Sequence, residues 1–127
     1  MRSRILSMGK FEELKVWQRA KNLAVYVYKL TSAWKDFGLR DQMRRASISV
    51  PSNIAEGDEY GSDKQSIKFF RFAKGSIAEL LTQSIIAREV DYLTDDVFYY
   101  LREECKGISA MLTKLISARS HTGHPSF

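Results

Sequence analysis

Apolar residues recur every three or four positions along most of the chain, and this period predicts α-helices. The first such stretch covers about residues 13–34 and contains neither glycine nor proline. Its apolar positions form one stripe: Val16, Trp17, Ala20, Leu23, Ala24, Val27, Leu30 and Trp34. A stripe of this width is typical of a helix that packs one face against a bundle.

A second stripe begins near Gly38 and has a proline inside it. Its members are Leu39, Met43, Ala46, Val50, Ile54 and Gly57. Pro51 has no N–H to donate to the carbonyl of Ser47, and its ring crowds that carbonyl, so the sequence predicts a kinked second helix. A rival interpretation ends the helix at Val50 and restarts it with Asn53 as the N-cap. The restarted piece would be barely one turn long, which favours the kink.

The third helix is predicted over about residues 63–92, and it is apolar beyond one seam. Ser62 with Gln65 three positions later forms a capping box that marks its start. The seam consists of Phe70, Ala73, Ile77, Leu80, Ser84 and Ala87. Phe69, Phe72 and Ile86 lie outside the seam, which indicates an oligomer interface. The alternative is that Phe69 and Phe72 only cover the end of the bundle.

Thr94 caps a fourth helix that is predicted to continue to about Arg119, with Gly107 allowing close packing. Short connections place consecutive helices antiparallel. The expected fold is therefore all-α, an antiparallel up-and-down four-helix bundle. Its expected limits are residues 11–119, between a loose N-terminal extension at 1–10 and a flexible C-terminal tail at 120–127.

A polar stripe accompanies the apolar seam between the second and third helices. Its predicted members are Arg45, Ser49, Asn53, Glu56, Ser76 and Glu79. An antiparallel pairing predicts Arg45 beside Ser76 and near Glu79. An unmatched buried polar group costs about 1–3 kcal/mol, so the stripe is expected to be an internal hydrogen-bonded network that fixes helix register. An RNA or ligand site is the alternative.

Charge is unevenly distributed along the chain, whose net charge is +5. Residues 1–45 hold 11 Lys or Arg and 4 Asp or Glu, a balance of +7. A positive surface of this kind attracts nucleic acid or another acidic partner. The candidate nucleic-acid-binding residues are Lys15, Arg19, Lys29, Arg40 and Arg44. Tyr26 and Tyr28 lie beside lysines, where packing is the expected role and base stacking the alternative.

Catalytic and metal-binding patterns are missing from the sequence. The two histidines, His121 and His124, fall in the predicted tail, so no Glu-x-x-His metal pair and no histidine base is available. No glycine-rich phosphate loop is present. We therefore expect no enzyme activity, no cofactor and no metal. Cys105 is the single cysteine, which suits a reducing cytoplasm, and neither a signal peptide nor a membrane span is expected.

Three segments carry a family resemblance: FEELKVWQRA at 11–20, DQMRRASISVPSNIAEG at 41–57 and FFRFAKGSIAELLTQ at 69–83. In these the chain resembles the bacterial four-helix-bundle proteins encoded in intervening sequences of 23S ribosomal RNA genes, and the likeness covers residues 11–119. The family is in turn similar to bundle proteins that accompany retroelements. The resemblance implies a homopentameric ring and contact with RNA or a ribonucleoprotein, and it transfers no functional residue.

Two functions follow as hypotheses. The first is a non-catalytic, oligomeric RNA-associated protein that binds ribosomal RNA, another RNA or a nucleic-acid-acting protein through its basic surface. The alternative is an oligomeric protein–protein scaffold or adaptor without direct nucleic-acid contact.

Overall fold

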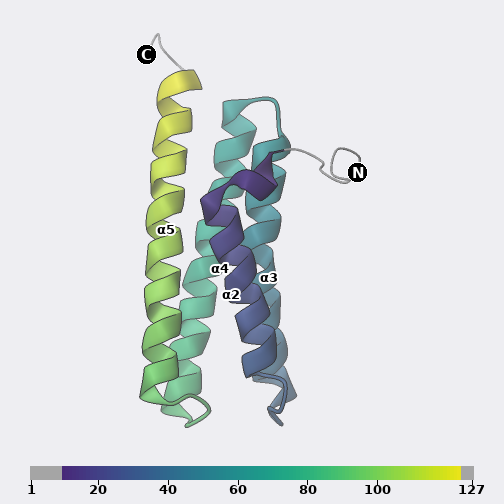
Figure 1. Ribbon diagram of the computed structural model, residues 1–127, viewed down its shortest axis with the longest axis vertical. Coiled ribbons are helices and arrows are strands. Elements are labelled where there is room, and N and C mark those ends of the chain that lie inside the picture. Colours follow the sequence, from purple (N-terminus) through teal and green to yellow (C-terminus); the bar gives the residue numbers. More distant parts are fainter. Residues whose placement is uncertain (1–9, 124–127) are drawn as a thin grey trace.

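The computed structural model describes residues 10–123, which form four long helices and one short 3-10 helix with no strand among them. The elements are η1 (Phe11–Glu13), α2 (Lys15–Leu30), α3 (Phe37–Glu59), α4 (Asp63–Glu89) and α5 (Asp95–Gly123). Successive helices run in alternating directions, each packs on the next, and α2 also touches α5 (Figure 1). The predicted all-α four-helix fold is confirmed.

The first long helix ends earlier than the sequence pattern predicts. α2 stops at Leu30, and the hydroxyl of Thr31 donates to the carbonyl of Val27 at 2.8 Å. The chain then turns, so Trp34 leaves the helix and packs edge-on against Tyr92 with ring centroids 4.9 Å apart. Trp34 continued the apolar stripe in the sequence, but it reaches the protein interior from a turn.

The second long helix passes through Pro51 without interruption. α3 is continuous from Phe37 to Glu59, so the interpretation that ends it at Val50 is wrong. Its start is fixed by Asp36, whose carboxylate accepts from the backbone N–H of Leu39 at 3.0 Å. The bend at Pro51 stays a prediction.

The start signals of the last two helices are confirmed. The backbone N–H of Gln65 donates to Ser62 Oγ at 3.3 Å, and that of Val97 donates to Thr94 Oγ1 at 3.3 Å. α5 continues to Gly123, beyond the end near Arg119 that the apolar pattern predicts, and the flexible tail stays a prediction. Extending an existing helix costs little, which allows residues without an apolar pattern to join it. Residues 1–9 and 124–127 lie outside the described part of the chain.

The core draws on all four long helices. Its largest fully buried apolar side chains are Phe70, Met43, Ile54, Leu80, Leu101, Ile108, Leu112, Val27 and Val50. Gly57 lets Phe70 approach the backbone of α3, and the hydroxyl of Ser66 donates to the carbonyl of Gly57 at 2.6 Å. These contacts hold α3 and α4 close together near their connection. No helix within residues 10–123 has the length and apolar character needed to cross a membrane.

Candidate functional site

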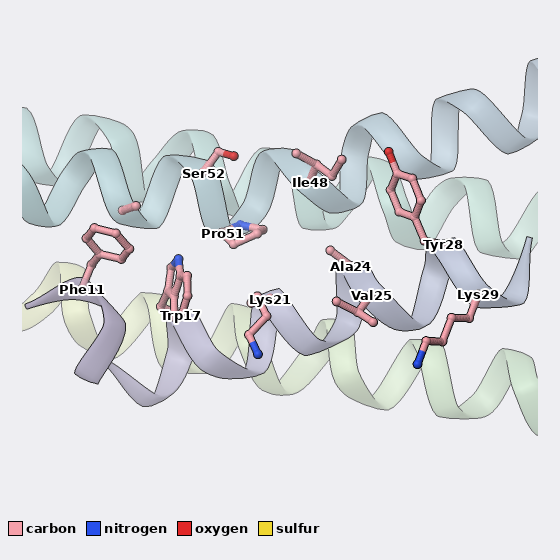
Figure 2. Close-up of a pocket in the computed structure, with 11 residues that line it drawn as sticks. Phe11, Trp17, Lys21, Ala24, Val25, Tyr28, Lys29, Ile48, Pro51 and Ser52 are labelled. Carbon is pink, nitrogen blue, oxygen red and sulfur yellow. The ribbon is translucent and has the colours of Figure 1, made fainter. Parts of the chain in front are cut away.

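An apolar groove of about 580 Å³ lies between α2 and α3, and we call it the α2/α3 groove. It is lined by Phe11, Trp17, Lys21, Ala24, Val25, Tyr28, Lys29, Ile48, Pro51, Ser52 and Ala55. In Figure 2 the rings of Phe11 and Trp17 lie near one end, Val25 of α2 and Ile48 of α3 lie on opposite sides near the middle, and Tyr28 lies towards the other end. The groove exists because apolar residues of α2 continue around the helix beyond its core face.

The aromatic rings of the α2/α3 groove are held in place by their neighbours. Phe11 packs edge-on against Trp17 with centroids 5.3 Å apart, and the guanidinium of Arg44 lies over Tyr28 at 4.4 Å. The side chains of Val25 and Ile48 are 45 % and 43 % exposed. The lining residues include no histidine and no carboxylate, so the groove is suited to docking apolar side chains rather than to acid–base chemistry.

A second apolar surface lies on α4, where the sequence predicts the oligomer interface. Phe72 and Ile86 are each 49 % exposed, while Phe69 is half-buried. Tyr60 stacks on Phe69 with centroids 5.1 Å apart, and Phe69 in turn meets Phe72 edge-on at 5.5 Å. Phe69 thus covers the α3–α4 end of the bundle, whereas Phe72 and Ile86 remain available for another molecule.

Part of the predicted polar network is present between α3 and α4. Ser76 Oγ donates to Ser49 Oγ at 2.8 Å, and the amide of Asn53 donates to the carbonyl and hydroxyl of Ser49 at 2.9 and 3.0 Å. The prediction that Arg45 lies beside Ser76 is wrong by about one helical turn, since Ser49 takes that place. The sequence pattern gives the facing sides of two helices but not their axial offset.

Arg45 lies one turn further along, in a polar cavity of about 410 Å³ that Glu79 and Gln83 also line. The carboxamide oxygen of Gln83 is buried there without a hydrogen-bond donor among the described residues. Glu79 and Glu56 are exposed and form no ion pair within the described part of the chain. The sequence pattern does not identify Gln83 as a member of this polar cavity, because its position opposite Arg45 depends on the axial offset between α3 and α4.

Three of the five candidate nucleic-acid-binding residues have intramolecular partners. Arg19 forms a two-bond ion pair with Glu104, at 2.9 and 3.2 Å, which raises the pKa of Arg19. The guanidinium of Arg40 contacts the carboxylate of Asp41 at 3.0 Å. Arg44 donates to Thr31 Oγ1 and to a main-chain carbonyl at the end of α2, at 2.9 and 3.0 Å. Arg19 and Arg44 therefore connect α2 to α5 and α3 to the end of α2, whereas the ion pair of Arg40 is with its neighbour on α3.

The other two candidates, Lys15 and Lys29, are exposed and form no ion pair among residues 10–123. Tyr26 packs against Tyr100 with centroids 4.7 Å apart, and burial raises the pKa of Tyr26. Packing is thus the role that the described contacts give Tyr26. Base stacking by either tyrosine of α2 stays a prediction.

The remaining reactive groups offer little chemistry. Cys105 is fully buried, and burial raises the pKa of its thiol to about 12. At neutral pH the side chain is therefore an uncharged part of the core. Within residues 10–123 no cluster of histidine, cysteine and acidic side chains could hold a metal ion.

Residues 12–114 match the sequence model of the 23S rRNA-intervening sequence proteins. The chain belongs to this family. The resemblance found in residues 11–20, 41–57 and 69–83 is therefore confirmed. No curated protein matches the chain significantly.

A similar solved structure supports the fold of this family member. It is a protein of unknown function from the S23 ribosomal protein family of Bacteroides thetaiotaomicron. The two chains share 21 % sequence identity with a TM-score of 0.75, and the match covers 80 % of this chain and 97 % of the other. At this identity the likeness establishes a common bundle fold.

Proposed function

We propose that this member of the 23S rRNA-intervening sequence protein family is a non-catalytic, self-associating protein that binds RNA, with ribosomal RNA or a ribonucleoprotein as its partner. The single observation that carries the proposal is the charge of α2. The helix contains no acidic residue, and Lys15, Lys21 and Lys29 project from it with no ion-pair partner among the described residues. Unpaired lysines attract phosphates and release counterions when they bind them.

Self-association is the second part of the proposal, and it rests on two different apolar surfaces. The α2/α3 groove is concave and flanked by Val25 and Ile48, whereas Phe72 and Ile86 stand out from α4. Surfaces of unlike shape favour a head-to-tail contact, in which the α4 surface of one copy enters the groove of the next. A head-to-tail contact that closes makes a ring, and we propose a homopentamer. Lys21 and Lys29 line this groove and would border the contact between copies, so the ring would repeat these lysines and Lys15, which lies outside the lining, around its circumference.

The experiment is an RNA-binding titration at two salt concentrations with a structured ribosomal RNA fragment. Affinity should fall steeply as salt rises, since several phosphates are neutralised together. Replacing Lys15 and Lys29 with glutamate should weaken binding without changing the melting temperature, because both side chains are exposed. Absence of binding at low salt would overturn the proposal.

A protein–protein scaffold is the second candidate, and the apolar lining of the α2/α3 groove favours it. A scaffold would capture its partner equally well after charge reversal at Lys15, which lies outside the groove lining. It would lose the partner after Val25→Glu, which places a charge in the groove. Lys15→Glu therefore separates the two functions, because only RNA binding should weaken. For either function we propose a cytoplasmic location, where the free thiol of Cys105 stays reduced.

A further inference from the structure

We propose that a cationic groove between α4 and α5 is the track on which the phosphodiester backbone of RNA lies, an inference that rests on the proposed RNA-binding function. We call it the α4/α5 groove, and it has a volume of about 410 Å³. It is lined by Lys74, Ile77, Ala78, Leu81, Cys105, Lys106, Ser109, Ala110 and Thr113. Figure 1 shows α4 and α5 side by side along most of their length.

Small side chains keep the α4/α5 groove open. Ala78 of α4 and Ser109 and Ala110 of α5 lie where larger residues would fill the space between the helices. The buried side chains of Ile77 and Cys105 form the floor. The result is a shallow channel with a mostly apolar floor, and two hydroxyl groups and two lysines lie along its walls.

The lysines of the α4/α5 groove are available to an anion. The ammonium of Lys74 donates to Thr113 Oγ1 at 2.8 Å, which leaves two of its three donors, and Lys106 is exposed with no ion-pair partner among the described residues. Thr113 in turn donates to the carbonyl of Ser109 at 3.1 Å. Lys74 therefore reaches across the groove from α4 to α5, where it is held by a neutral group that does not cancel its charge.

Two further cations lie on α5 outside the lining of the groove. Arg102 and Lys114 lie four residues before and eight residues after Lys106, so the three span about 18 Å along the helix axis. Neither forms an ion pair with another described residue. A nucleic-acid strand carries a phosphate about every 3.4 Å of helix rise, so this length accommodates several phosphates.

Carboxylates are kept out of the α4/α5 groove. None occurs among its lining residues. Of the two acidic residues before Cys105, Glu104 is paired with Arg19 on the α2 side of the bundle, whereas Glu103 is exposed three residues before Lys106 but does not line the groove. At the far end of the α4–α5 hairpin, Asp95 is paired with Arg88 at 2.9 Å.

The α4/α5 groove also remains open in the proposed assembly. Lys74 follows Phe72 by two residues, which places the two side chains about 200° apart around α4. Self-association through Phe72 and Ile86 therefore uses the opposite flank of the helix. Each copy in a ring would present its own track to the same RNA.

The test compares two variants that lose the same charge. Lys74→Gln with Lys106→Gln removes two cations from the groove, and Lys15→Gln with Lys29→Gln removes two from α2. The probe is a labelled oligouridylate of about 16 nucleotides, and binding is measured by fluorescence anisotropy across a salt series. The groove variant should bind about tenfold more weakly, and its slope of log affinity against log salt should decrease by about 1.4. The α2 variant should also bind more weakly, but its loss of affinity and its decrease in slope should both be smaller than those of the groove variant.

Several results would overturn the inference. If the groove variant binds as tightly as the wild type, or if only the α2 variant binds more weakly, the α4/α5 groove is not the RNA site, and the proposed function still stands. If the wild type does not bind the probe, both the groove inference and the proposed function are wrong. Equal displacement of the probe by polyglutamate of the same charge would make the ligand an acidic peptide instead of RNA. If the double variant fails to fold, Lys106→Gln alone should still reduce the slope by about 0.7, since its side chain has no described partner.

Discussion

The guanidinium of Arg19 lies over the backbone of Gly107, about one turn of α5 beyond its ion-pair partner Glu104. A Cβ atom added at Gly107 would overlap the guanidinium group. The glycine thus leaves room for the ion pair that ties α2 to α5, the two neighbouring helices that contact each other least. Close packing at Gly107 is expected from the sequence, but its partner could not be foreseen.

We predict that Gly107→Ala changes stability differently with and without Arg19. Alanine favours a helix interior over glycine by about 1 kcal/mol, and the displaced, partly exposed ion pair offsets about 0.5–1 kcal/mol of that gain. The wild type should therefore change by less than about 0.5 kcal/mol, whereas Arg19→Ala should gain about 1 kcal/mol from the same substitution. Urea unfolding of the four proteins measures the difference. Equal gains in both backgrounds would show that the two residues are not in contact.

Two other glycines provide a matched pair of substitutions. A Cβ at Gly57 would lie 2.6 Å from Phe70 Cε1 and 3.1 Å from the carbonyl oxygen of Ser66, whereas one at Gly75 meets nothing within 4 Å. Gly57→Ala should lower the free energy of unfolding by about 1–3 kcal/mol through overpacking. Gly75→Ala should raise it by about 0.5–1 kcal/mol through helix propensity. Thermal and urea denaturation measure both effects. If Gly57→Ala stabilises the protein as Gly75→Ala does, the close contact between Gly57 and Phe70 is wrong.

The polar residues between α3 and α4 should differ in their effect on stability. Asn53 is half-buried and donates two hydrogen bonds to Ser49, so Asn53→Leu should cost about 1–2 kcal/mol. Glu79 is exposed and pairs with no described residue, so Glu79→Ala should stay within about 0.5 kcal/mol of the wild type. Denaturant titration distinguishes them, and equal losses would place Glu79 inside the network.

The buried thiol of Cys105 predicts a loss of stability at alkaline pH. Burial raises its pKa from 9.0 to about 12, so above pH 9 the unfolded chain gives up this proton while the native protein retains it. The unfolded state then binds fewer protons, and stability falls by up to about 1.4 kcal/mol per pH unit until the native thiol also ionises. Cys105→Ala should lose this part of the pH dependence. The free energy of unfolding of both proteins is measured between pH 8 and 10.5. The same pH dependence in both would show that the thiol of Cys105 does not cause the loss of stability.

The helices and their start points could be predicted because their signals are local. The apolar period of α3 and the caps at Ser62 and Thr94 each involve residues within a few positions of one another. The end of α2 could not be predicted in this way. Trp34 has the right spacing to continue the helix, and only its distant contact with Tyr92 favours the turn.

The candidate site was harder to predict because it depends on pairs of residues that are far apart in sequence. Arg19 and Glu104 are separated by 85 positions, so nothing local marks this arginine as structural. The hydrogen bond of Lys74 to Thr113 across the α4/α5 groove depends equally on the axial offset of the helices. Composition reveals that cations are in excess, but the tertiary structure decides which of them are already paired.

Self-association should depend on one flank of α4, and two consecutive isoleucines test this. Ile86 and Ile85 are 49 % and 41 % exposed, and their side chains point about 100° apart around the helix. Ile86→Glu places a charge on the surface that includes Phe72, so it should shift the protein to monomers at all concentrations in sedimentation velocity. Ile85→Glu adds the same charge towards α5 and should leave the oligomer intact. Dissociation by Ile85→Glu alone would move the interface to the α4/α5 side, where it would cover Lys74 and Lys106 and exclude RNA from that groove.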